Sequence, residues 1–405
     1  MDEIGDTCRA DPTIVLIGRR LFQATNKKPE SMQETRKTVM NDMRLLARLF
    51  LAVKSLVHCD TAESMFLRTN FATLEQAIDM ITKENSKLKH GMKNKIYYLL
   101  DSSREILVGH YYSLNMDAKA EEIEKFQKLL DLNKSVIFGD AIHAVHMKRQ
   151  KKLRMPEQMA DEEDVKKLRQ HICNTITHYT SELTFMGPHE YIKLRDSICA
   201  RVTLFNARRG EEPARLRLDQ YDDIKSERWV NSKQKKRLEE WEKKLFKDLE
   251  VTYQSGKGDH LVTDFIPLDC RKGLDILADV DVRRRAGVPD TNDYLFPNTQ
   301  KSGYHVTGWS AIHTMCEEAE VENPSLLTAT KQRHRISTIY STMNVPETDR
   351  QYFYKHMGLS KEVNLGTYQY PLPVLAVTKV GRHLQEFDKG KHLRKLMSHC
   401  DVHSE

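Results

Sequence analysis

Long apolar runs, paired cysteines and a strong excess of one charge are missing from this sequence of 405 residues. Because no stretch of 18 apolar residues occurs, we expect no membrane-spanning helix and no membrane partner. The seven cysteines are scattered, odd in number and never spaced Cys-x-x-Cys, a usage typical of reduced thiols inside cells. The N-terminal residues lack the charged-then-apolar pattern of a secretory signal, which also indicates an intracellular protein.

The charge balance is only mildly basic and does not by itself indicate a polyanionic partner. Lys and Arg number 64 and Asp and Glu 58, which gives a formal net charge of +6. No acidic cluster has a metal-binding spacing, and the C-terminal His and Cys residues match no known zinc arrangement, so we expect no metal and no cofactor. The length allows two or three domains, and 39% hydrophobic residues can build substantial cores.

Residues 1–150 have the apolar periodicity of a succession of helices, with no competing strand signal. The predicted helices span residues 31–56, 73–84, 90–112, 117–130 and 133–147. Ser31 followed by Glu34 has the form of a capping box at the start of the first of them. We therefore predict an all-helical domain over residues 1–150.

A basic run follows at residues 146–154, where five of the nine residues are Lys or Arg. These are Lys148, Arg149, Lys151, Lys152 and Arg154. The run could be a solvated linker between domains, a strap along a DNA backbone or a nuclear-import patch. A linker between two DNA-gripping domains would combine the first two interpretations, and the sequence leaves them open.

Residues 151–405 form the second predicted domain, in which helices flank a small antiparallel sheet. Strand-like segments at 251–253 and 260–266 surround Gly256-Lys257-Gly258, which predicts a hairpin. Short strands are also expected at 214–219 and 229–230, and a helix rich in Lys and Glu at 233–247. The expected fold class is thus mainly α with a small antiparallel β-sheet (α+β).

Four separated groups carry side chains that suit chemistry at a phosphodiester: the segment 206–216 with its arginines and two carboxylates, Gly256-Lys257-Gly258, the Arg333-His334-Arg335 run and Tyr368. Two guanidinium groups can hold the non-bridging oxygens of a phosphate, and those bonds strengthen as charge develops in the transition state. A lysine can protonate the leaving oxygen, and a tyrosine hydroxyl can attack phosphorus and hold the strand covalently. Such a site needs no metal, because cationic side chains neutralise the phosphate.

Each of these groups also has an ordinary structural interpretation. The Arg209 segment could be a surface ion-pair cluster, and the Gly-Lys-Gly sequence around Lys257 is a common hairpin tip. Arg333 lies in an Arg-His-Arg run that could be a solvated basic face, and Tyr368 alone would be expected to pack in a core. Only the combination indicates chemistry.

The combination resembles the catalytic domain of the tyrosine recombinases, the phage-integrase family. In that family the first arginine stands in a motif of the form Arg-x-x-Glu, which Arg209 and Glu212 match better than Arg208 does. The family lysine sits in a hairpin, often between glycines, as Lys257 does here.

The C-terminal part of the resemblance rests on Arg333 and Tyr368. The second arginine of the family is often followed by a histidine, as Arg333 is followed by His334. The attacking tyrosine stands nine residues after a Leu-Gly-His motif, and Tyr368 stands nine residues after Leu359. The neighbouring Tyr354 and Tyr370 do not fit this spacing. The resemblance covers about residues 155–380.

The resemblance implies DNA strand cleavage and rejoining, in site-specific recombination or integration, through a 3′-phosphotyrosyl intermediate. It implies Arg209, Lys257, Arg333 and Tyr368 as catalytic residues, and residues 1–150 as a core-binding domain that clamps double-stranded DNA. The likeness is closest to recombinases of eukaryotic mobile elements such as cryptons. Family members usually act as homotetramers on DNA, and a eukaryotic host would place the protein in the nucleus.

Two positions depart from the family pattern. Thr330 stands where the family has His, and Leu359 stands where it has His or Trp. Lys331 is adjacent to Thr330 but is rotated by about 100° on a helix, and His356 is expected to face elsewhere. Loss of one proton-transfer group lowers a rate by about 10²–10⁴. A catalytically eroded DNA-binding protein on a recombinase scaffold is therefore the main alternative, and a DNA-relaxing topoisomerase is a third.

Overall fold

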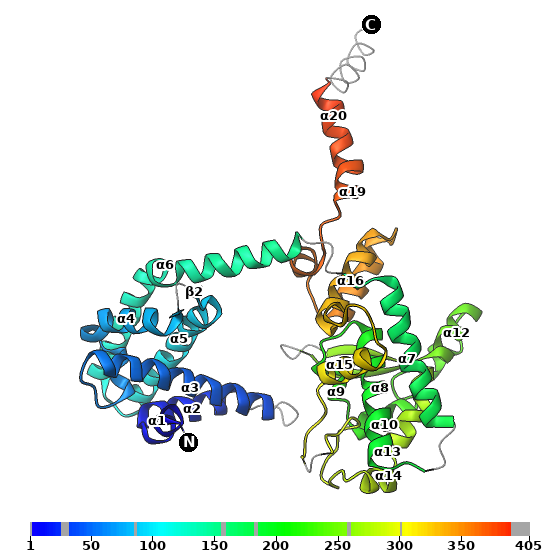
Figure 1. The fold of residues 1–405 in the computed structure, drawn as a ribbon, viewed down its shortest axis with the longest axis horizontal. Coiled ribbons are helices and arrows are strands. Elements are labelled where there is room, and N and C mark those ends of the chain that lie inside the picture. The colour runs from blue at the N-terminus through cyan, green and yellow to red at the C-terminus, as the bar shows by residue number, and fades with distance from the viewer. Residues whose placement is uncertain are drawn as a thin grey trace. The chain divides into compact units, whose positions relative to one another are not determined.

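A computed structural model describes residues 2–25, 32–84, 87–154, 159–181, 185–256, 261–299 and 302–389 (Figure 1). The chain divides into two compact units, residues 1–152 and 153–405, and each unit has its own hydrophobic core. Secondary structure in the described residues is mainly helical with two small antiparallel sheets, which confirms the predicted fold class. None of the described helices combines the length and apolar character needed to cross a bilayer.

The first unit is a helical body around one core. Its helices are α1 (Glu3–Ala10), α2 (Pro12–Thr25), α3 (Met32–Leu56), α4 (Phe71–Thr82), α5 (His90–Ser113) and α6 (Asp117–Leu153). The 3-10 turns Ala62–Phe66 and Arg68–Asn70 precede α4, and the short strands β1 (Lys83–Glu84) and β2 (Lys87–Leu88) follow it. Phe66 and Phe126 meet edge to face in the core, with ring centroids 5.7 Å apart.

Three details of the first unit differ from the sequence prediction. The two helices expected at 117–130 and 133–147 are one continuous helix, α6, because Asn133 donates to Leu129 O, 2.9 Å away, and does not cap a new helix. The β1–β2 ladder interrupts the all-helical pattern, and α1 and α2 were not predicted. The basic run, for which no secondary structure was predicted, continues α6, where Lys148, Arg149 and Lys151 are exposed.

The second unit is organised around α8 (Pro188–Asn206), which packs against α7 (Glu162–Ser181), α15 (Gly308–Glu318), α13 (Arg271–Ala278) and strand β4 (Leu261–Pro267) (Figure 1). Pro188 occupies the first turn of α8, where its missing N–H is harmless. The buried residues Tyr191, Leu194 and Ile198 of α8 meet Ile312 and Met315 of α15 in the core.

The remaining elements surround this centre. They are α9 (Glu211–Ala214), α10 (Leu218–Lys225), α11 (Ser232–Lys235), α12 (Glu240–Asp248), β3 (Leu249–Ser255), β4 (Leu261–Pro267), α14 (Val280–Arg285), α16 (Ala329–Thr342), α17 (Glu347–Met357), α18 (Lys361–Val363), the π-helical turn η8 (Asn364–Tyr368), α19 (Pro373–Ala376), the π-helical turn η9 (Val377–Gly381) and α20 (Arg382–Asp388), with the 3-10 turns Leu268–Cys270 and Pro324–Leu326.

The predicted hairpin is confirmed, because β3 pairs antiparallel with β4 and Thr252 stands opposite Asp264. The short strands predicted at 214–219 and 229–230 are wrong. The first segment ends α9 and begins α10, with only an isolated bridge between Arg217 and Tyr294. The helix predicted at 233–247 is divided into α11 and α12, because the Trp229 and Phe246 rings stack, 5.5 Å apart, and fold the segment back on itself.

A buried ammonium ties three helices of the first unit together. The side chain of Lys93, on α5, is 4% exposed, and its Nζ lies 3.0 Å from both Asp79 of α4 and Asp140 of α6. Asp79 also pairs with Lys83, 2.6 Å away, but the Lys83 side chain is 54% exposed. The two lysines therefore make the same type of bond in different surroundings, and only Lys93 is desolvated.

Lys93→Ala is expected to lower the free energy of opening of α4 and α5 by about 2 kcal/mol or more, because it removes a packed stem and leaves two carboxylates without their shared cation. Lys83→Ala is the matched control at the same carboxylate and should lower it by less than about 1 kcal/mol. Hydrogen exchange of the α4 and α5 amides in the full chain measures both changes. Equal losses in the two variants would contradict this account of Lys93.

Candidate active site

Arg209 lies in the tight connection between α8 and α9. Ala207 ends α8 in the left-handed conformation, with φ 49°, and turns the chain. The Arg209 side chain is one-third exposed, and its Nη1 lies 2.9 Å from Oε1 of the buried Glu212. Burial lowers the pKa of this guanidinium, but the nearby Glu212 carboxylate and Tyr368 hydroxyl more than offset that effect and raise it.

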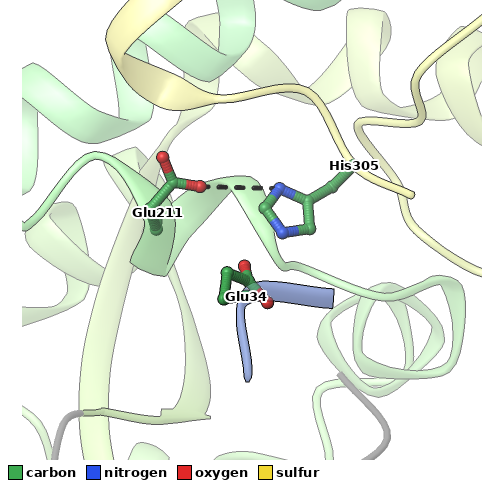
Figure 2. Close-up of side chains that lie close together, drawn as sticks. All are labelled: Glu34, Glu211 and His305. Atoms are coloured by element: carbon green, nitrogen blue, oxygen red, sulfur yellow. Dashed lines mark ion pairs between the residues drawn. The ribbon is translucent and has the colours of Figure 1, made fainter. Parts of the chain in front are cut away.

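Two further contacts fix this connection from outside. Gly308, at the start of α15, lies against Gly210, and a Cβ on Gly308 would stand 1.9 Å from Gly210 O, so only glycine fits there. The Glu211 carboxylate points at the nearly buried His305, 3.9 Å from its Nδ1 (Figure 2). The backbone that carries Arg209 is therefore held against α15 and the segment that precedes it.

Arg333 lies on α16, which Thr328 caps by accepting from Lys331 N at 3.2 Å. Arg333 is 1% exposed and therefore buried. Its Nη1 donates to Ala207 O at 3.3 Å and its Nη2 to Met357 O at 2.8 Å. Burial lowers the pKa of Arg333, and Tyr368 opposes that effect, while the nearby Arg209 adds to it. Arg333 and Arg209 therefore lie within electrostatic reach of each other.

Tyr368 ends the π-helical turn η8 and lies over both members of the Arg333-His334 pair. Arg333 Cζ is 4.9 Å from the centroid of the Tyr368 ring, a cation–π contact. His334 Nδ1 lies 3.0 Å from Tyr368 O, so its N–H donates to that carbonyl, and the two rings are 5.0 Å apart. The buried Asn364 donates to Ser337 Oγ at 3.1 Å and ties η8 to α16. The structure thus brings Arg209, Arg333 and Tyr368 together.

The structure does not test the roles of the other residues of the sequence prediction. Lys257 lies outside the described residues, although both strands of its hairpin are described. Thr330 is exposed on the first turn of α16, Lys331 is half-buried there, and Leu359 is half-buried just after α17. Their catalytic roles and that of Lys257 stay predictions.

His356 and Tyr370 face other parts of the fold than the Tyr368 hydroxyl. His356 Nε2 lies 2.9 Å from Asn206 O, and its ring stacks on Phe265 of β4, so it joins the hairpin to α8. Burial lowers the pKa of His356, which favours the neutral imidazole. Tyr370 is buried and stacks on His334, with ring centroids 5.2 Å apart. Tyr368 is the tyrosine near both guanidinium groups, as the spacing predicts.

A buried cluster behind Arg209 was not predicted from the sequence. Arg208 has a fully buried side chain, and its Nη2 lies 2.8 Å from Glu212 Oε2 while its Nε lies 3.6 Å from Asp264 Oδ1. It also donates to His356 O. Burial raises the pKa of Asp264 to about 7, an effect that Arg208 opposes and Glu212 reinforces. The alternation of the sequence along β4 could have indicated that Asp264 is buried, because Asp264 shares the inward-facing positions of this strand with Val262 and Ile266.

Comparisons with known proteins add little information about the function of this site. No family model matches the sequence, and no curated protein matches it. One solved structure that is similar is a XerH site-specific recombinase bound to its difH substrate in a pre-cleavage complex. It shares 13% identity over 91% of this chain and 97% of that chain, with a TM-score of 0.40. A likeness at this level carries no argument about function, which rests on the side chains described above.

Asp264→Asn is expected to change how the stability of the second unit depends on pH. The folded chain holds a proton on Asp264 up to about pH 7, whereas the unfolded chain releases it near pH 4. The free energy of unfolding therefore falls as pH rises through this window. Between pH 5 and 8, the asparagine variant should gain on the order of 2–3 kcal/mol relative to wild type.

Tryptophan fluorescence during urea unfolding measures this difference, because Trp229, Trp241 and Trp309 all lie in the second unit. Asp248→Asn is the control, since Asp248 is exposed at the end of α12 and carries the same charge. An unchanged pH dependence in Asp264→Asn would show that this carboxyl titrates normally.

Proposed function

We propose that this protein cleaves and rejoins double-stranded DNA as a tyrosine recombinase, through a covalent 3′-phosphotyrosyl intermediate. The observation that carries the proposal is the meeting of Tyr368 with Arg209 and Arg333. The phenol is close enough to the Arg209 guanidinium to help raise its pKa, and its ring lies 4.9 Å from Cζ of Arg333. This is the set of groups that a metal-free attack on a phosphodiester requires.

In the proposed step, Tyr368 Oη forms a bond to phosphorus while the bond between phosphorus and the 5′ oxygen breaks. The phenolic proton passes to water, and Lys257 donates a proton to the leaving 5′ oxygen. Arg209 and Arg333 hold the non-bridging oxygens and neutralise the charge that develops on them. Because the Tyr368 ring covers the buried Arg333, the ring must swing aside for the phosphate to reach that guanidinium.

The wider assignment belongs to the same proposal. The partner is double-stranded DNA, and the exposed Lys148, Arg149 and Lys151 at the end of α6 supply cations for its backbone. The working form is a homotetramer on DNA. The biological role is site-specific recombination or integration by a mobile element of crypton type, in the nucleus of a eukaryotic host.

A second candidate is a DNA-binding protein that has lost its catalytic power. It is favoured by the side chains at Thr330 and Leu359, neither of which can shuttle a proton near neutral pH. The imidazole of His356 is engaged with Asn206 O through Nε2. This alternative keeps the DNA-binding surface of the proposal and removes the covalent step.

A nicked suicide duplex, from which the cleaved strand diffuses away, tests the tyrosine assignment. Wild type should form a covalent protein–DNA adduct and Tyr368→Phe should form none, because the attacking oxygen is gone. Tyr370→Phe is the matched control, since it removes a buried hydroxyl from the neighbouring tyrosine and should leave adduct formation intact. Denaturing gel electrophoresis measures the adduct. Equal trapping by wild type and Tyr368→Phe would exclude Tyr368 as nucleophile.

Restoring the two family histidines separates the active enzyme from the eroded scaffold. The double variant Thr330→His, Leu359→His should cleave the suicide duplex faster than wild type by on the order of 10²-fold, since each imidazole can move a proton. The double variant Thr330→Ala, Leu359→Ala controls for side-chain replacement. Duplex binding without adduct formation by any of these proteins would favour the non-catalytic alternative.

A further inference from the structure

Asp264 is a buried carboxyl group that the proposed reaction does not use. It lies on the inward face of β4 opposite Thr252, and both of its oxygens are buried with no hydrogen-bond partner among the described residues. Its cationic neighbour is Arg208, whose Nε is 3.6 Å away. A buried carboxylate with so few donors is costly to keep ionised, whereas its neutral form loses no hydrogen bond here.

Asp264 is linked to the phosphate-binding arginines by a short series of ionic contacts. Arg208 lies between Asp264 and Glu212, and Glu212 in turn holds Arg209. Arg208 and Arg333 donate to consecutive carbonyls, those of His356 and Met357, at the end of α17. An anion bound to Arg209 and Arg333 therefore raises the energy of a negative charge on Asp264, because the protein interior between them screens charge weakly.

The groups that face this cluster from the surrounding elements are few. Arg208 and Glu212 lie on the α8–α9 side, and the neighbouring inward positions of β3 are the uncharged Thr252 and Gln254. From α17, His356 packs on Phe265, next to Asp264, and its pKa is lowered by burial, so it is neutral above pH 7. Among these groups, Asp264 is the one poised to change its charge near neutral pH, since burial raises its pKa to about 7.

We propose that Asp264 couples DNA binding to proton uptake: above neutral pH it is largely ionised while the arginine site is empty, and a DNA phosphate in that site shifts it toward the protonated form. The proposal rests on the proposed function only in that a phosphodiester binds Arg209 and Arg333. With the site empty, the guanidinium groups of Arg208, Arg209 and Arg333 face two carboxylates. A bound phosphate adds a third anion, and the carboxyl with no hydrogen bonds is the one that takes up a proton.

The size of the coupling follows from Coulomb's law. A unit charge about 10 Å away, at an effective dielectric constant of about 20, raises the pKa of a carboxyl group by about one unit. Because the DNA-bound form then holds more protons than the free form, binding weakens as pH rises. The dissociation constant of the wild type should increase by about five- to tenfold between pH 7 and pH 9, with uptake of roughly 0.4 proton at pH 8.

Fluorescence anisotropy of a labelled duplex at fixed salt measures the affinity. Asp264→Asn imitates the protonated acid, so its dissociation constant should stay level from pH 7 to pH 9 and lie below that of wild type at pH 9. Asp248→Asn removes an exposed charge near the foot of the same hairpin and should keep the wild-type response. This pH range lies above the ordinary titration of histidine, and fixed salt keeps the phosphate-contact contribution constant.

Proton uptake can also be measured on the wild type alone, by calorimetric titration of the same duplex in two buffers with different ionisation enthalpies at pH 8. No uptake at pH 8, or the same pH response in wild type and Asp264→Asn, would overturn the inference. Failure of the proposed function gives a different pattern. In that case wild type does not bind the duplex, or Arg209→Ala binds it as tightly as wild type does.

Discussion

The carboxylate of Glu212 is the group on which the rest of the candidate site depends. One of its oxygens binds Arg208 and the other binds Arg209, so two adjacent arginines point to opposite sides of one short turn. Arg208 is held inward and fully buried, while Arg209 stays partly exposed and able to meet a ligand. Without this shared anion, the guanidinium groups of Arg208 and Arg209 would repel each other. The buried Arg208 would also lose most of the ion pairing that offsets the cost of its desolvation.

Arginine side chains also position the segment that carries Tyr368. The C-terminal carbonyls of α17 accept from Arg208 and Arg333, and Gly358 follows them with φ 60°, a left-handed helix end. Cations at a helix C-terminus also interact favourably with its dipole. The segment that leads to Tyr368 is thus anchored to the two arginine-bearing elements by backbone atoms, before any side chain of that segment takes part. The hydrogen bond from His334 to Tyr368 O is a further bond to a backbone carbonyl, between α16 and the turn that ends at Tyr368.

Local signals in the sequence were enough to predict the helical character, the hairpin and the residues that could gather around a phosphate. Arg209, Arg333 and Tyr368 do lie together, although their chemical roles are not tested by geometry alone. The strands expected at 214–219 and 229–230 are wrong because the apolar residues there lie in turns and helix ends. In the first segment a long-range bridge from Arg217 to Tyr294 holds the chain. The Arg208–Asp264 pair was missed because the inward position of Asp264 on β4 does not reveal its partner, Arg208, which lies far away in the sequence.

The backbone anchoring of α17 has a consequence for how this surface can diverge. The carbonyls of His356 and Met357 would be present whatever side chains those positions carried, and the turn at Gly358 depends on φ rather than on neighbouring chemistry. Position 359 can therefore exchange leucine for a polar or aromatic residue without displacing the phenol nine residues later. Such an arrangement lets the side chains of this surface change over evolutionary time while the backbone that carries them stays the same.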